Sequence, residues 1–150
     1  MEERFRTFTV LITKINRSIR RIKTEEMGEL NLKSPHVSCL YYLYKMESLT
    51  ATELCDICQE DKASISRSID TLENDGYIEC ESNAKKRYNS LLRLTSKGAK
   101  IGKLLADKID NILDLASNGL SEEKRNNMYE SLMLISDNLE KFCKNYEEEK

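Results

Sequence analysis

The sequence predicts a mainly α-helical fold that carries one small β-hairpin. Only five of its 150 residues are glycine and one is proline, a composition typical of long helices joined by few turns. Apolar residues recur at helical spacing through most of the chain. Two short stretches rich in strand formers, residues 77–80 and 90–94, depart from this pattern and predict the hairpin.

The first and last helices carry heptad seams. The first is expected over residues 3–26 and the last from Ser121, and in both the apolar residues alternate in spacings of three and four. An apolar stripe on so long a helix is poorly covered by one small core, so pairing of two chains is favoured over packing within one chain. The seam residues expected at this homodimer interface are Phe5, Phe8, Ile12, Ile15, Ile19, Leu132, Ile135, Leu139 and Phe142.

Capping signals mark the helices between the two seams. Ser34 followed by Pro35 predicts an N-cap and a proline at the first position of a helix that reaches about Met46. Thr50 with Glu53 forms a capping box for the next helix. A further helix begins near Asp61 and ends before Gly76, and one after the hairpin is capped by Thr95 or Ser96 and stops at residues 118–119.

The helix over residues 61–76 combines one buried face with an unusual polar face. Ile65, Ile69 and Leu72 share the apolar stripe, which leaves Ser64, Arg67, Ser68 and Thr71 opposite. Short hydroxyls around one arginine can donate and accept hydrogen bonds at base edges and phosphates. A surface helix built only for solubility would more often carry glutamate and lysine at these positions.

The loop between the two expected strands is basic, with Lys85, Lys86 and Arg87 near its tip. Taken alone, a solvated loop without a partner is an equally good interpretation. A helix-turn-helix followed by a basic hairpin, however, is the element order of a winged helix, which favours phosphate contact.

At this point the sequence resembles the MarR family of bacterial transcription regulators. The resemblance rests on four segments and on their order and separation, and it covers nearly the whole chain; the segments are residues 52–54, 61–73, 76–78 and 94–98. Two positions depart from the family pattern. Gln59 stands where the turn usually holds a glycine, and Lys85-Lys86-Arg87 replaces a common Asp-Arg-Arg run in the wing.

The resemblance implies a sequence-specific DNA-binding transcription regulator that acts as a homodimer, with repression favoured over activation. A twofold dimer sets two recognition helices about one turn of double-stranded DNA apart, so the site is expected to be a near-palindrome. It also implies two regions, a winged helix-turn-helix over residues 34–99 and a dimerisation region formed by residues 1–33 and 100–150. The expected DNA contacts are Lys62, Ser64, Ser66, Arg67, Ser68, Thr71, Lys85, Lys86 and Arg87.

Relatives often respond to small aromatic ligands in a cleft between the dimer helices and the winged helix. Cys39, Tyr41, Tyr42 and Tyr44 are the candidates for lining such a cleft here. Ordinary packing of these side chains in the core and interface is the favoured alternative.

The net charge of −2 argues against indiscriminate nucleic-acid binding but permits a local basic patch. Attraction to DNA would come from the wing, from Arg93 and from the basic middle of the first helix, namely Lys14, Arg17, Arg20, Arg21 and Lys23. The acidic balance slightly favours one alternative, a winged helix that binds protein partners without DNA.

The five cysteines do not form a disulfide or zinc pattern. Cys55 and Cys58 make one C-x-x-C, but a second pair is absent and His36 is the only histidine, which is expected to cap a helix or face solvent. Both cysteines are interpreted as core thiols whose pKa is raised by burial. A thiol-based redox or metal sensor that uses them remains an alternative, and otherwise no metal or cofactor is expected.

Catalytic signatures such as a Ser-His-Asp set or a glycine-rich phosphate loop are missing from the sequence, so an enzyme is not expected. No apolar run approaches the roughly 20 residues that span a bilayer, and Glu2, Glu3 and Arg4 do not fit a signal peptide. A cytoplasmic protein without membrane contact is expected.

Overall fold

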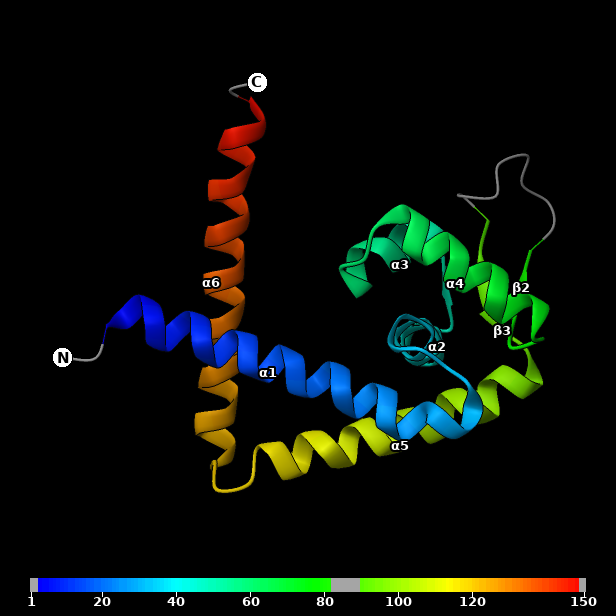
Figure 1. Cartoon of the computed structure of the whole chain (residues 1–150), viewed down its shortest axis with the longest axis horizontal. Coiled ribbons are helices and arrows are strands. Elements are labelled where there is room, and N and C mark those ends of the chain that lie inside the picture. Colours follow the sequence, from blue (N-terminus) through cyan, green and yellow to red (C-terminus); the bar gives the residue numbers. More distant parts are fainter. Residues whose placement is uncertain (1–2, 82–89, 149–150) are drawn as a thin grey trace. The chain divides into compact units, whose positions relative to one another are not determined.

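The computed structural model describes residues 3–81 and 90–148, and the chain divides into two compact units, Met1–Lys108 and Ile109–Lys150 (Figure 1). The predicted mainly helical fold with a small antiparallel sheet is confirmed. The elements in chain order are α1 (Arg4–Met27), η1 (Gly28–Leu30), α2 (Ser34–Met46), β1 (Ser48–Leu49), α3 (Ala51–Cys58), α4 (Lys62–Asn74), β2 (Ile78–Cys80), β3 (Leu92–Leu94), α5 (Ser96–Ala116) and α6 (Glu122–Glu148).

The core of the first unit forms around α2. This helix packs against α1, α3, α4 and β3, and Figure 1 shows it nearly end-on between α1 and the α3–α4 pair. Leu40, Leu43, Leu54 and Leu72 are at most 1% exposed. Each such side chain contributes about 2 kcal/mol through burial. This core holds α3 and α4 in a helix-turn-helix.

The helix ends follow the capping signals with one exception. The Thr50 N–H donates to Glu53 Oε2 at 2.7 Å, and the Glu53 N–H donates to Thr50 Oγ1 at 3.2 Å, which confirms the capping box. Asp61 Oδ1 accepts from the Ser64 N–H at 2.7 Å at the start of α4. Gly76 has φ +75°, as predicted for the residue that ends α4.

The exception is the start of α2. Ser34 already lies inside the helix, and Lys33 is the N-cap residue, so the predicted N-cap is wrong by one position. The reason is a side-chain cap from within the helix, because His36 Nδ1 accepts from the Lys33 N–H at 3.2 Å. His36 therefore caps α2, as expected, and it is buried rather than facing solvent.

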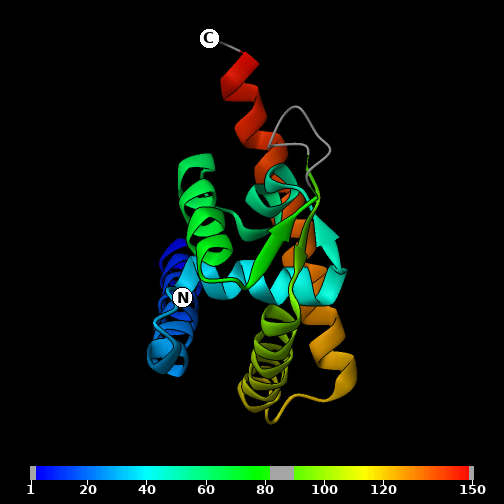
Figure 2. The ribbon, with the colours of Figure 1, turned by 90° about the vertical axis from the view of Figure 1, so that its right-hand side faces the viewer.

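A third strand, which the sequence did not indicate, completes the sheet (Figure 2). β1 pairs antiparallel with β3, and β3 pairs antiparallel with β2, in the order β1-β3-β2. Leu49 lies opposite Leu92, and both are buried together with Ile78. β1 escapes prediction because two residues, Ser48 and Leu49, are too few to show an alternating pattern.

The first turn of α5 fixes the position of the hairpin against α4. Thr95 Oγ1 donates to the Gly76 carbonyl at 2.7 Å and accepts from the Gly98 N–H at 3.0 Å, so Thr95 is the predicted cap. A Cβ placed on Gly98 would lie 1.8 Å from the Tyr77 carbonyl oxygen. Only glycine allows this close approach between α5 and the turn that follows α4.

The second unit contains the end of α5 and all described residues of α6. Gly119 has φ +87° and ends α5 where predicted, and Ser121 Oγ accepts from the Lys124 N–H at 3.3 Å at the start of α6. In residues 3–81 and 90–148, no helix is long and apolar enough to cross a membrane.

Candidate nucleic-acid interface

Helix α4 presents one face to the core and the other to solvent. Ile65, Ile69 and Leu72 are buried, as predicted. Arg67 and Thr71 are exposed, and Ser64 and Ser66 are half-buried. The Thr71 hydroxyl donates to the Arg67 carbonyl at 2.9 Å, which leaves its oxygen facing outward as an acceptor.

Ser68 does not belong to this exposed face, and the prediction that it does is wrong. The residue is 3% exposed, and its hydroxyl donates to the Ser64 carbonyl at 3.0 Å. Ser68 follows Ile65 by three positions and precedes Leu72 by four, so the helical period places it on the buried stripe. Its hydroxyl is hydrogen-bonded within the helix and is not accessible to a binding partner.

The N-terminal end of α4 adds a cation and an oriented backbone. Lys62 is exposed at the first position of the helix. A helix N-terminus carries a partial positive charge that attracts phosphate, although the Asp61 cap already occupies part of it. The exposed features of α4 are therefore Lys62, Arg67, Thr71 and the partly exposed hydroxyls of Ser64 and Ser66.

The turn between α3 and α4 keeps its left-handed geometry without glycine. Gln59 has φ +52°, a conformation that costs a residue with a Cβ about 1 kcal/mol. Its side chain compensates locally, because Nε2 donates to the Asp56 carbonyl at 2.6 Å. Glutamine therefore holds the left-handed conformation in which the family pattern usually has glycine.

The base of the wing is described, whereas Lys85, Lys86 and Arg87 lie outside the described residues. An ion pair joins Arg93 Nη2 of β3 to Glu81 Oε1 at 3.1 Å, and both side chains are about half exposed. This pair partly neutralises Arg93, which the sequence suggested as a source of attraction. It also ties the end of the β2 strand to β3.

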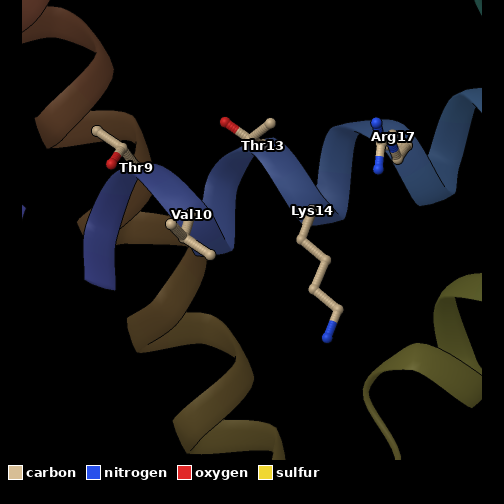
Figure 3. A pocket seen from close by; sticks show the side chains of 5 residues that line it. All are labelled: Thr9, Val10, Thr13, Lys14 and Arg17. Atoms are coloured by element: carbon tan, nitrogen blue, oxygen red, sulfur yellow. The ribbon is translucent and has the colours of Figure 1, made fainter. Parts of the chain in front are cut away.

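Among the basic residues in the middle of α1, Lys14 and Arg17 are exposed, whereas Lys23 turns toward α2. Lys14 and Arg17, with neighbouring Thr9, Val10 and Thr13, line an open hollow of about 470 Å³ along one side of the helix (Figure 3). Lys23 instead turns inward, and its Nζ donates to Ser38 Oγ of α2 at 2.9 Å. The sequence did not indicate this contact, because the spacing of cations on α1 does not show which of them meets α2.

The tyrosine-rich helix α2 contributes packing. Cys39 is fully buried, and the rings of Tyr41 and Tyr42 meet edge to face with centroids 5.2 Å apart. Tyr44 lies against α5, because a Cβ added to Gly102 of α5 would lie 2.8 Å from the Cβ of Tyr44. None of the four lines the hollow on α1. The small aromatic ligand remains a prediction.

Cys55 and Cys58 are not the fully buried core thiols that the sequence predicted. Cys55 and Cys58 are both partly exposed, whereas Cys39 is buried. Burial raises the pKa of Cys55, as expected. Interaction with Cys39 and with the Lys23 ammonium lowers the pKa of Cys58, so that expectation is wrong for Cys58. Within residues 3–81 and 90–148, no cluster of three His, Cys, Asp or Glu side chains is placed to hold a metal.

A helix-turn-helix whose second helix is followed by a short antiparallel hairpin defines a winged-helix protein. The model of the MarR family matches residues 30–87, which include α2, α3, α4 and β2. Solved structures extend the similarity to nearly the whole chain. By this match and by its fold, the chain resembles the MarR family of winged-helix transcription regulators.

A Listeria monocytogenes protein described as a MarR-family transcriptional regulator, crystallised with a 26-mer DNA, is 27% identical with a TM-score of 0.79. The match covers 93% of this chain and 90% of that one. Two others share the fold at lower identity. The S. aureus MepR–DNA complex is 19% identical (TM-score 0.77, covering 91% and 99%). NMB1585 from Neisseria meningitidis is 22% identical (TM-score 0.77, covering 93% and 97%). The search of curated proteins finds no match.

Proposed function

We propose that this protein is a sequence-specific DNA-binding transcription regulator that places α4 in the major groove of a near-palindromic site. The observation that carries the proposal is the amphipathic character of α4. Its apolar face packs into the core, and Arg67 is exposed on the opposite face. The Listeria monocytogenes relative, at 27% identity, was crystallised with DNA, which supports the same partner for this chain.

The exposed groups divide between base reading and backbone contact. Arg67 is the one side chain of this face that can make a bidentate contact, typically to a guanine edge. Ser64, Ser66 and Thr71 supply short hydroxyls beside it, and Lys62 is placed for a phosphate. The wing residues Lys85, Lys86 and Arg87 are proposed to contact the flanking backbone, so that phosphate binding is shared between two elements.

A homodimer supplies the second α4 that a palindromic site requires. Seam residues of α1 and α6 are exposed within a single chain, each by 37% or more of its surface; they are Phe8, Ile12, Ile15, Ile19, Leu132, Ile135, Leu139 and Phe142. Exposed stripes of this extent mark an association surface. A second copy of the chain is the proposed partner, because the two seams share one heptad spacing.

Repression is the proposed sign of regulation, since a dimer seated on an operator excludes other proteins from it. Release by a small aromatic ligand is an extension that rests on the resemblance to the family rather than on a described cavity. The net charge of −2 favours one other candidate, a winged helix that binds a protein partner instead of DNA.

Selection of duplexes from a random pool by the pure protein separates these candidates. Recovery of one near-palindrome with half-sites about one helical turn apart supports a dimeric regulator. Recovery of a single half-site would overturn the dimer while retaining DNA binding. A pool that shows no enrichment, at salt low enough for phosphate contacts to form, would favour the protein-binding module.

A further inference from the structure

Helix α1 is the most basic helix of the chain. Residues 4–24 carry seven lysines and arginines and no aspartate or glutamate, in a chain whose net charge is −2. The rest of the chain, taken together, therefore has a net charge of −9. An anionic partner is attracted to α1 more strongly than to the rest of the chain as a whole.

Three of these cations form one stripe along the helix, which we call the basic stripe. Lys14, Arg17 and Arg21 each follow a residue of the apolar seam by two positions. Two residues of an α-helix turn through about 200°, so the basic stripe lies opposite the seam. Pairing of the seams in the proposed dimer does not use this face of α1.

The basic stripe keeps its charge at the surface. All three side chains are exposed, and within the described part of the chain no carboxylate lies in ion-pair range of Lys14 or Arg17. Arg21 Nε lies 3.9 Å from Glu25 Oε1, with the two side chains 81% and 72% exposed. So exposed a pair contributes little, and Arg21 remains able to bind another anion.

The basic stripe points away from the helix-turn-helix. Lys23 follows Arg21 by two positions and donates to Ser38 Oγ of α2 at 2.9 Å, so Arg21 lies on the side of α1 that is turned away from α2. Figure 1 shows α2 between α1 and the α3–α4 pair. A straight duplex bound by α4 therefore runs on the other side of α2 and does not reach the basic stripe.

The chemistry of this face fits the phosphates of duplex DNA. The open hollow of about 470 Å³ is lined by Thr9, Val10, Thr13, Lys14 and Arg17 (Figure 3). Threonine hydroxyls, lysine and arginine are common donors to phosphate oxygens, and one guanidinium can bind two such oxygens at once. A single strand is held by stacking of its bases on aromatic side chains, and both phenylalanines of α1 belong to the opposite seam.

An anionic membrane would use α1 in a different way. A helix that lies on a membrane buries its apolar face among the lipids. For α1 that face is the seam, which we propose to be paired with a second copy. Binding of DNA by the basic stripe leaves the seam in the dimer, so duplex DNA is the partner that both faces of α1 allow.

We propose that the basic stripe of α1 is a second, sequence-independent binding surface for the phosphate backbone of duplex DNA. At about 1.5 Å per residue the basic stripe is about 10 Å long, so each copy contacts a few phosphates. The consequence for the dimer rests on the proposed function. One dimer holds its operator on α4 and a second duplex, or a distant segment of the same DNA, on α1.

The first test occupies α4 before it probes α1. The dimer is saturated with the selected duplex, and binding of a fluorescent duplex of random sequence is followed by anisotropy over a range of salt. The wild type is expected to bind this second duplex with a slope of about −2 to −5 in log K against log salt, since two copies of three cations contribute about −0.9 for each phosphate. Sedimentation that shows only one duplex per dimer at saturation would overturn the proposal.

The second test removes the basic stripe with Lys14→Gln, Arg17→Gln and Arg21→Gln together, because glutamine keeps the helix propensity. Affinity for the second duplex should fall about tenfold or more, and affinity for the selected duplex should change by less than about twofold. Light scattering checks the mass of this variant. Loss of the dimer would assign the basic stripe to contact with the second copy and would overturn the proposal.

A matched control removes the same charge from α6, with glutamine at Lys124, Lys141 and Lys144. It should bind the second duplex as the wild type does. An equal loss in this control would show that net charge, not the basic stripe, attracts the DNA. Flotation with vesicles of phosphatidylserine and phosphatidylcholine tests the membrane. Vesicle binding that depends on the basic stripe, without binding of a second duplex, would overturn the proposal in favour of a lipid surface.

Failure of the proposed function is separated by a protein whose operator contacts are removed, with alanine at Arg67 and at the three wing cations. This protein is titrated with the random duplex alone. Binding that is lost on removal of the basic stripe supports the surface on α1 even where the selection recovers no operator. Absence of binding at low salt, in a protein that remains folded and dimeric, would overturn the surface on α1 whatever α4 binds.

Discussion

The winged-helix core buries its apolar residues within one chain, whereas the terminal helices leave many of theirs exposed. Around α2, the leucines at positions 40, 43, 54 and 72 are buried within one chain, and α3 and α4 end in caps or left-handed turns. Along α1 and α6, apolar side chains remain exposed, for example Ile15 at 55% and Leu139 at 53%. The first region buries its apolar side chains within one chain, whereas the second leaves its seam exposed for the second copy that we propose.

The largest expected effect comes from placing charge in the seam. Ile15→Asp combined with Leu139→Asp should abolish the dimer, because a carboxylate buried without a partner costs several kcal/mol. Light scattering at micromolar concentration reports the mass of the particle. As a control, Ser131→Asp changes the charge of α6 at a polar position and should leave the dimer intact. A wild-type monomer would remove the distinction between the two regions.

The next effect concerns the wing and is measured from the salt dependence of DNA affinity. Each phosphate neutralised by a cation contributes a slope of about −0.9 to log K against log salt. Replacing Lys85, Lys86 and Arg87 with alanine in both protomers should flatten the slope by about two to four units, similarly on specific and random DNA. Alanine at Lys124, Lys141 and Lys144 of α6 removes the same charge elsewhere. An equal flattening in that control would show that net charge, not the wing, sets the slope.

A smaller effect tests the packing of the core. Gly98→Ala places a methyl group 1.8 Å from the Tyr77 carbonyl oxygen, a backbone atom that cannot move aside cheaply. We expect a loss of about 3 kcal/mol in the free energy of unfolding. Gly28→Ala is the matched control, because its Cβ meets nothing within 4 Å. Equal urea midpoints for the two variants would contradict the close approach of α5.

The smallest effect separates base reading from backbone contact on α4. Arg67→Ala should weaken binding to the selected site by roughly 1–3 kcal/mol and binding to random DNA by less, since a bidentate base contact discriminates sequence. Arg125→Ala, on α6, is the control for loss of one arginine. Equal losses on both DNAs would reassign Arg67 to a phosphate. Unchanged affinity on both would remove α4 from the interface.

Much of the fold follows from local chemistry and could be predicted without a structure. The Thr50–Glu53 capping box, the Asp61 and Thr95 caps and the left-handed Gly76 and Gly119 depend on residues within a turn of one another. The buried stripe Ile65, Ile69 and Leu72 follows from the helical period. The order of these elements was enough to indicate the family.

The side of α4 that each hydroxyl occupies required the structure. Thr71 faces solvent and Ser68 faces the core, although both are short, polar and close in sequence. A serine can satisfy its hydroxyl on the backbone carbonyl four residues earlier, so polarity alone does not place it outside. The two-residue strand β1 was invisible for a different reason, because only its partner β3 defines it.

The sequence by itself determined the helices, most of their caps, the heptad spacing of the seams and the class of protein, since these depend on neighbours along the chain. Only the tertiary structure decided which side chains from separate helices meet. Cys58 stands three residues from Cys55 in the sequence, yet Cys39 of α2 and the Lys23 ammonium of α1 lower its pKa, whereas burial raises the pKa of Cys55. The pKa of a thiol depends on the charges, donors and burial around it in space, and these are set only when α1, α2 and α3 pack together.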